Sequence, residues 1–133
     1  MCKAGDIILV KEYSHDEVVL PQHSFVIIYD VAGNVKGLLY DVVCSVMSSF
    51  KSELHKTKKL SFRENFYIDP NDTIMSIKSA NSKEGYIKAD QFYFFNLSKI
   101  EYEIIGSMMP DCFNRLIEFI ESLPKYEHVT SNL

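Results

Sequence analysis

A short basic segment is the part of the chain best suited to chemistry on an anion. Five of the fourteen Lys and Arg residues fall between Lys51 and Arg63, where Glu53 alone opposes them. The whole chain has a formal net charge of −4, which argues against general nucleic-acid binding, but a local cluster can still hold a phosphate group. The anion-binding candidates are Lys51, His55, Lys56, Lys58, Lys59 and Arg63. The alternative is a solvated charged loop with no ligand.

Cofactor-dependent chemistry has little support in the sequence. The cysteines Cys2, Cys44 and Cys112 are widely spaced and odd in number, so we expect neither a disulfide framework nor a zinc site. Cys44 and Cys112 lie among apolar residues and are expected to be buried free thiols. No glycine-rich phosphate loop is present. We therefore expect no cofactor and no metal. Because the N-terminus lacks a signal-peptide pattern, we expect a soluble, cytoplasmic protein with no membrane partner.

The elements that must position these residues are mostly strands. Short runs rich in β-branched and aromatic residues, separated by turn residues, predict strands over residues 7–10, 24–30, 60–68, 73–78, 86–95 and 100–105. Residues 35–47 are compatible with a strand plus a helical turn, and periodicity does not decide between the two. Loops are expected over residues 14–22, 48–59 and 79–85.

One helix is expected after the strands. Pro110 suits a first helical turn and Pro124 ends the pattern. An apolar stripe with helical spacing runs between them: Phe113, Leu116, Ile117, Ile120 and Leu123. The polar end of the chain, residues 125–133, is expected to be loose. The 133 residues therefore predict one mainly β domain over 1–133, a small barrel or sandwich with a C-terminal α-helix and a flexible tail from residue 126.

Four segments occur along the chain in an order and at a spacing that indicate a known family. They are the opening Gly-Asp-Ile-Ile-Leu-Val run at 5–10, the Phe-Val-Ile-Ile strand at 25–28 after a polar loop, the Val-Met-Ser-Ser segment at 46–49, and the Glu-Gly-Tyr-Ile-Lys-Ala-Asp-Gln segment at 84–91. With a terminal helix following, this set resembles the PemK/MazF ribonuclease toxins of bacterial toxin–antitoxin systems, from Gly5 to about Leu123. The resemblance implies an SH3-like small barrel of the PemK/MazF/CcdB type.

The resemblance also implies a function and partners. The family cuts single-stranded RNA, including mRNA, without a metal, forms homodimers and is held inactive by a cognate antitoxin protein. On this basis the basic segment would hold RNA phosphates beside the cleavage site. The chain departs from the family at one important place, because His23-Ser24 occupies the positions of a usual Arg-Pro pair whose arginine is catalytic.

The resemblance places the catalytic candidates at His23, Ser48 and Ser49. Cutting RNA with its own 2′-hydroxyl requires a group that takes the 2′-OH proton, a group that protonates the leaving 5′-oxygen, and cations that stabilise the charge on phosphorus. His23 suits either proton transfer, since imidazole titrates near neutrality; the alternative is a loop histidine with only a local hydrogen bond. Ser48 or Ser49 would donate to the scissile phosphate, or would simply form a turn. His55 is a possible second proton-transfer group.

Two functions fit this sequence. The first is an endoribonuclease toxin. The second is a non-catalytic barrel of the same fold that inhibits a protein target, as the CcdB gyrase poisons do, or only binds RNA. The missing arginine favours the second, whereas the basic segment and the pairing of His23 with Ser48 favour the first.

Overall fold

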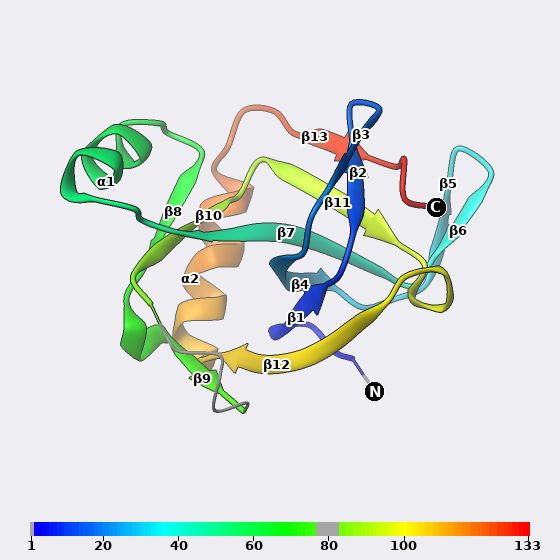
Figure 1. The fold of residues 1–133 in the computed structure, drawn as a ribbon, viewed down its shortest axis with the longest axis horizontal. Coiled ribbons are helices and arrows are strands. Elements are labelled where there is room, and N and C mark those ends of the chain that lie inside the picture. The colour runs from blue at the N-terminus through cyan, green and yellow to red at the C-terminus, as the bar shows by residue number, and fades with distance from the viewer. Residues whose placement is uncertain (1, 77–82) are drawn as a thin grey trace.

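Strands dominate the structure, which confirms the prediction of a mainly β fold (Figure 1). The computed structural model describes residues 2–76 and 83–133. The main sheet contains β1 (Asp6–Val10), β4 (His23–Tyr29), β7 (Val42–Ser49), β8 (Asn65–Ile68), β9 (Thr73–Met75), β10 (Gly85–Lys88), β11 (Gln91–Phe95), β12 (Tyr102–Met108) and β13 (Glu127–Val129). The remaining elements are the hairpins β2 (Tyr13–His15) with β3 (Val18–Leu20) and β5 (Gly33–Val35) with β6 (Leu38–Tyr40), helices α1 (Glu53–Leu60) and α2 (Pro110–Glu121), and the 3-10 turns η1 (Pro70–Asp72) and η2 (Leu97–Lys99).

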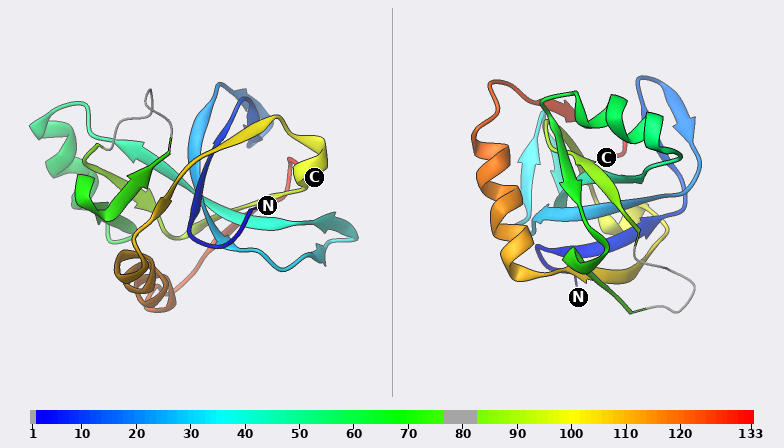
Figure 2. Two further views of the ribbon diagram at one scale, coloured as in Figure 1. Left: turned by 90° about the horizontal axis from the view of Figure 1, so that it is seen from below. Right: turned by 90° about the vertical axis from the view of Figure 1, so that its left-hand side faces the viewer.

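The main sheet curls into a half-barrel (Figure 2). Its path is β13-β11-β7-β4-β1-β12-β9, and β10 pairs with both β7 and β8 off this path. Neighbouring strands are antiparallel except for β11 and β13, which are parallel. The long strand β7 runs from the β5–β6 hairpin at one end of the molecule to α1 at the other (Figure 1). Its far end, at Ser49, therefore lies next to the basic helix.

The central strands bury both faces, because consecutive side chains of a strand point to opposite sides. One core cluster takes Ile7 and Val26, together with side chains of β8, β10, β12 and α2. The other takes Ile8 and Phe25, together with Tyr13 of the β2–β3 hairpin, Tyr93 and Val129. Helix α2 therefore covers one face of the sheet, and the hairpin with the end of the chain closes the other. Cys44 and Cys112 are buried free thiols, one in each cluster, as predicted.

Helix α2 forms where the sequence predicts a C-terminal helix. Pro110 occupies its first turn and Asp111 supports its positive end. Its apolar stripe buries Cys112, Leu116 and Ile120 against the sheet, while Glu118 faces outward. The stripe therefore anchors the helix to the first core cluster.

Removing the centre of this stripe should destabilise the protein strongly. Leu116 is fully buried, so we expect Leu116→Ala to lower the free energy of unfolding by about 2–5 kcal/mol through lost transfer energy and a residual cavity. Urea denaturation followed by circular dichroism measures the change. Glu118→Ala on the exposed side of the same helix is the control and should stay within about 0.5 kcal/mol of the unmodified protein. A loss below about 1 kcal/mol for Leu116→Ala would mean that the helix is not anchored here.

Four segments differ from their predictions. Residues 14–22, expected as a loop, contain the β2–β3 hairpin, and residues 35–47 contain β5–β6 pairing and β7 with no helical turn. The expected loop over 48–59 contains the end of β7 and most of α1, and β8 begins only at Asn65. The expected strand over 86–95 is interrupted by a turn at residues 89–90 and forms β10 and β11.

The end of the chain also differs from its prediction, because residues 125–133 are tied down instead of loose. Strand β13 pairs with β11, with Tyr93 opposite Val129. Beyond it, the Asn132 side chain accepts a 2.7 Å hydrogen bond from the Ser14 amide. His15 Nε2 lies 2.9 Å from a carboxylate oxygen of Glu127. The chain end and the β2–β3 hairpin therefore hold each other in place.

Two further expectations fall partly outside the described ranges. Of the strand expected over residues 73–78, Thr73–Met75 forms β9, and residues 77–78 lie outside the described residues. So does most of the loop expected over 79–85. Within residues 2–76 and 83–133, neither helix has the length and apolar character needed to span a membrane.

Candidate functional site

Two of the catalytic candidates are neighbours across the central strands. Ser24 pairs with Met47 between β4 and β7, so His23 and Ser48 occupy the next positions on this antiparallel ladder. Ser48 in turn pairs with Tyr86 of β10, which pairs with Tyr67 of β8. Cross-strand partners project from the same face of a sheet. His23, Ser48, Tyr86 and Tyr67 therefore form one row of side chains near the ends of four strands.

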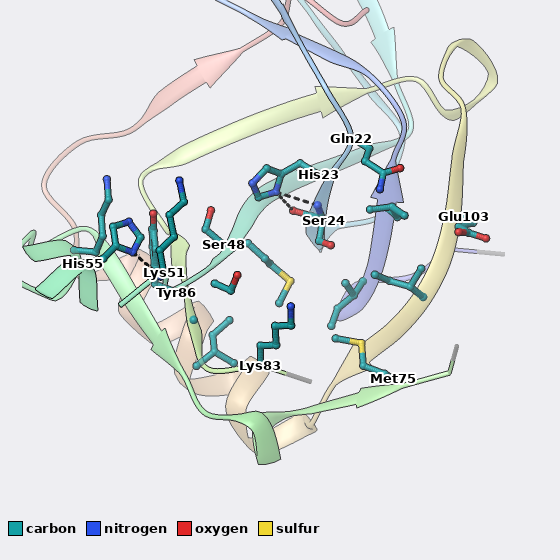
Figure 3. Close-up of a pocket in the computed structure, with 18 residues that line it drawn as sticks. Gln22, His23, Ser24, Ser48, Lys51, His55, Met75, Lys83, Tyr86 and Glu103 are labelled. Atoms are coloured by element: carbon teal, nitrogen blue, oxygen red, sulfur yellow. Dashed lines mark hydrogen bonds between the residues drawn. The ribbon is translucent and has the colours of Figure 1, made fainter. Parts of the chain in front are cut away.

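This row borders a cleft of about 860 Å³ (Figure 3). Its apolar part continues the first core cluster and consists of Ile7, Leu9, Met47, Ile68, Met75 and Ile105. Its polar part comes from strand ends, from α1 and from the loop before it, and consists of Gln22, His23, Ser24, Ser48, Ser49, Lys51, His55, Lys59, Lys83, Tyr86 and Glu103. Ser24 and Met47 pair on one face of the sheet, and His23 and Ser48 project from the other, so the cleft is lined from both faces at the strand ends. A concave site with apolar walls and a few polar groups is the usual form of a ligand site.

The cleft is positively charged although the protein is acidic. The described lining residues include three lysines, Lys51, Lys59 and Lys83, and one carboxylate, Glu103. Figure 3 shows Glu103 on the side away from Lys51 and His55. Field lines concentrate in a cleft with low-dielectric walls. The side of the cleft with Lys51 and His55 therefore attracts an anion, although the whole chain has a net charge of −4.

His23 presents its imidazole at the cleft with one ring nitrogen held by the backbone. The Ser24 amide donates to His23 Nδ1 at 3.0 Å, and the Ser24 carbonyl oxygen lies 3.3 Å from the same nitrogen. The ring packs edge-on against Tyr13 and Phe25, with centroids 6.4 and 6.3 Å away. These contacts fix the orientation of the ring, and within the described residues they leave Nε2 available to a ligand.

His55 enters the same cleft from α1. Ser52 caps this helix by accepting the His55 amide at 3.1 Å, and the Lys51 amide donates to His55 Nδ1 at 3.1 Å. The ring packs against Phe50 and Tyr86, with centroids 6.2 and 6.4 Å away. The two histidines thus have the same arrangement: Nδ1 contacts a backbone amide and Nε2 has no partner within the described residues.

Polar contacts hold α1 in position, because this helix buries none of its residues. Lys56 forms a 3.0 Å ion pair with Glu84, which also accepts a hydrogen bond from the Tyr67 hydroxyl of β8. Asn65 of β8 donates to the Lys59 carbonyl oxygen at 2.8 Å. The hydrogen bonds from Tyr67 and Lys56 lower the pKa of the Glu84 carboxyl. This network connects the helix that carries His55 to the strands that carry Tyr67 and Tyr86.

The Tyr67 hydroxyl reports on this network. Its hydrogen bond to Glu84 raises the pKa of Tyr67 to about 12 from 10.0. The hydrogen bond from Tyr67 to Glu84 stabilises the folded state below pH 10. This stabilisation is lost as the pH rises through 12, because the Tyr67 hydroxyl loses the proton that it donates. We expect Glu84→Gln to return the Tyr67 pKa toward 10, since it removes the carboxylate. Near-ultraviolet absorbance titration measures this, with Tyr67→Phe identifying the signal. An unchanged midpoint in Glu84→Gln would show that Glu84 does not hold Tyr67.

Gly85 allows β10 to approach β7 closely at the site. A Cβ at this position would lie 2.1 Å from the Ser48 carbonyl oxygen, closer than any real contact allows. The Gly85–Ser49 and Tyr86–Ser48 pairs depend on this approach. The glycine therefore sets the separation between Ser48 and Tyr86.

The structure brings together six of the nine residues selected from the sequence. His23, Ser48, Ser49, Lys51, His55 and Lys59 all line the cleft. Lys56, Lys58 and Arg63 are not among its described lining residues. Lys56 is instead paired with Glu84, Lys58 is exposed on α1, and Arg63 is exposed just after it.

Five polar lining residues were not selected from the sequence: Gln22, Ser24, Lys83, Tyr86 and Glu103. The segment 84–91 already stood out in the sequence, but only the register of β10 against β7 brings Tyr86 next to Ser48. Gln22 precedes His23 and so had a positional signal. Lys83 and Glu103 reach the cleft only through the curl of the sheet. Searches of this chain against protein-family models, curated proteins and solved structures find no match.

Proposed function

We propose that this protein is a metal-independent endoribonuclease that cuts single-stranded RNA, acting as the toxin of a type II toxin–antitoxin system. The observation that carries the proposal is the common cleft, which gathers His23, His55 and Ser48 with three lysines. In this proposal the half-barrel is an SH3-like barrel of the PemK/MazF type.

In this proposal the cleft supplies the general base and the charge stabilisation, and solvent supplies the proton for the leaving group. His23 takes the proton of the 2′-hydroxyl, the 2′-oxygen forms a bond to phosphorus, and the bond from phosphorus to the 5′-oxygen breaks. The 5′-oxygen takes a proton from solvent, which leaves a 2′,3′-cyclic phosphate and a 5′-hydroxyl. Ser48 donates a hydrogen bond to the phosphate, and Lys51 and Lys59 stabilise its negative charge. Because the nucleophile is the 2′-hydroxyl, DNA is bound and not cut.

Partners follow from the same proposal. Single-stranded RNA lies with its phosphates near Lys51, Lys59 and Lys83. A cognate antitoxin protein covers the cleft, and the active form is a homodimer. A gene for a short acidic protein next to the gene for this chain would support the antitoxin partner.

One observation favours the non-catalytic alternative. The positions of the usual Arg-Pro pair hold His23-Ser24, and no described lining residue of the cleft is an arginine. A barrel that inhibits a protein target, such as gyrase, or that only binds RNA, needs no proton transfer and tolerates this replacement.

Incubating the purified protein with single-stranded RNA in EDTA tests the proposal. We expect cleavage at defined sites, with 2′,3′-cyclic phosphate ends, while a DNA oligonucleotide of the same sequence stays intact. Intact RNA together with inhibited gyrase supercoiling would favour the alternative. Cleavage that EDTA abolishes would contradict the metal-free mechanism.

A further inference from the structure

From the sequence, His55 was expected either to bind phosphate as part of a basic loop or to act as a second proton-transfer group. It is the third residue of α1, is half-buried, and faces the cleft from a helix instead of a loop. Ring contacts with Phe50 and Tyr86 restrict its rotation. Figure 3 shows it beside Lys51 at the side of the cleft, with Ser48 between this side and His23. The side chain is therefore held ready for a ligand in the cleft.

The contact at Nδ1 determines which tautomer this arrangement requires. The Lys51 amide is a donor, so the Nδ1 that it contacts at 3.1 Å must offer a lone pair. A neutral imidazole with an accepting Nδ1 carries its proton on Nε2. The described residues provide no acceptor for Nδ1 that would favour the other tautomer or the doubly protonated ring. His55 therefore carries its N–H at Nε2, on a side chain that lines the cleft.

His23 differs from His55 in the groups around its Nδ1. Its Nδ1 lies near both a donor, the Ser24 amide at 3.0 Å, and an acceptor, the Ser24 carbonyl oxygen at 3.3 Å. Either tautomer, and the doubly protonated ring, therefore finds a partner at Nδ1. A proton can arrive at or leave Nε2 of His23 without losing this contact, whereas protonation of His55 at Nδ1 would cost it the Lys51 hydrogen bond.

We propose that His55 binds the reacting phosphate as a neutral hydrogen-bond donor through Nε2–H and does not transfer a proton, so that His23 is the sole proton-transferring imidazole of the cleft. This inference rests on the proposed ribonuclease function. It adds a catalytic residue with a defined chemical role, because the His55 N–H stabilises the charge that develops on a phosphate oxygen. No bond to hydrogen breaks at His55 during the reaction.

Substitution by glutamine separates a donor from a proton-transfer group. The glutamine side-chain amide places an N–H near the position of the imidazole Nε2 but does not ionise. We expect His55→Ala to lower kcat for RNA cleavage by about 10²-fold, the usual loss for one preorganised donor, and His55→Gln to stay within about tenfold of the unmodified enzyme. His23→Gln should be as inactive as His23→Ala. Circular dichroism and urea denaturation verify that each variant folds.

A modified substrate gives an independent measurement. In an RNA with sulfur in place of the scissile 5′-oxygen, the leaving thiolate needs no proton. We expect the His55→Ala defect to persist on this substrate. Full rescue would show that His55 is a proton donor and would overturn the inference, as would equal loss in His55→Gln and His55→Ala on ordinary RNA. If the unmodified protein cuts no RNA, the proposed function itself fails and the inference fails with it.

Discussion

Replacing His23 with alanine should lower the rate of RNA cleavage by about 10²- to 10⁴-fold, the usual contribution of a positioned proton-transfer group. The reason lies in the geometry of the ring. Its Nδ1 is held by the Ser24 backbone and the ring makes edge contacts with Tyr13 and Phe25, so the imidazole is already oriented at the cleft before a ligand binds. Single-turnover kinetics with excess enzyme, measured in EDTA, isolates the chemical step.

Two controls make this result specific. His128 is an exposed histidine of β13 outside the cleft, and His128→Ala should cleave RNA at the unmodified rate. RNA affinity of His23→Ala should change little, because the lysines remain. A His23→Ala variant that folds, binds RNA and still cleaves it at the original rate would show that the His23 imidazole transfers no proton.

Neutralising Lys51 and Lys59 together should produce the second large effect, this time on binding. Both lysines line the cleft, and each phosphate contact on a single strand contributes about 0.7 to the slope of log affinity against log salt. We expect the double Lys→Gln variant to bind RNA more weakly and to lose about 1.4 from this slope. Titrations at several salt concentrations in the His23→Ala background keep the RNA intact.

The matched control uses two of the three basic candidates that lie outside the cleft; the third, Lys56, is paired with Glu84. Lys58 and Arg63 belong to the same charged stretch and are exposed, so Lys58→Gln with Arg63→Gln removes the same charge. We expect this pair to reduce the slope by less than half as much, because only long-range attraction is lost. Equal changes for the two double variants would mean that the RNA contacts the whole helix surface and not the cleft.

The parts of the fold that sequence reasoning recovered are those with a strong periodic signal. Strands β1 and β4 alternate between two cores, and α2 has an apolar stripe bounded by prolines. Helix α1 has no such periodic signal, because Leu54 and Leu60 are too few to form an apolar stripe. Both are exposed in the structure. Its only indicators are the Ser52 cap, Glu53 in the first turn and Lys58 and Lys59 in the last, which are local features that a charged loop also contains.

The β2–β3 hairpin and strand β13 could not be predicted for a different reason. The β2–β3 hairpin turns through Asp16 and Glu17, both with positive φ, and these are not the glycine-containing pairs that mark tight turns. Three-residue strand β13 exists only because β11 offers it an edge. The candidate site shows the same limit: residue types pointed to His23 and Ser48, whereas Lys83 and Glu103 depend on how the sheet curls.

The pairing of β1 with β12 has a kinetic consequence. It joins Asp6 to Ser107, residues about one hundred positions apart in the chain, and closing so long a loop costs chain entropy. We therefore expect the chain to fold on the slow, millisecond-to-second scale of proteins dominated by distant strand pairs. Because Leu9 and Glu103 on these strands form one wall of the cleft, a newly made chain has no complete cleft until β1 and β12 pair. Activity would therefore appear only after this pairing.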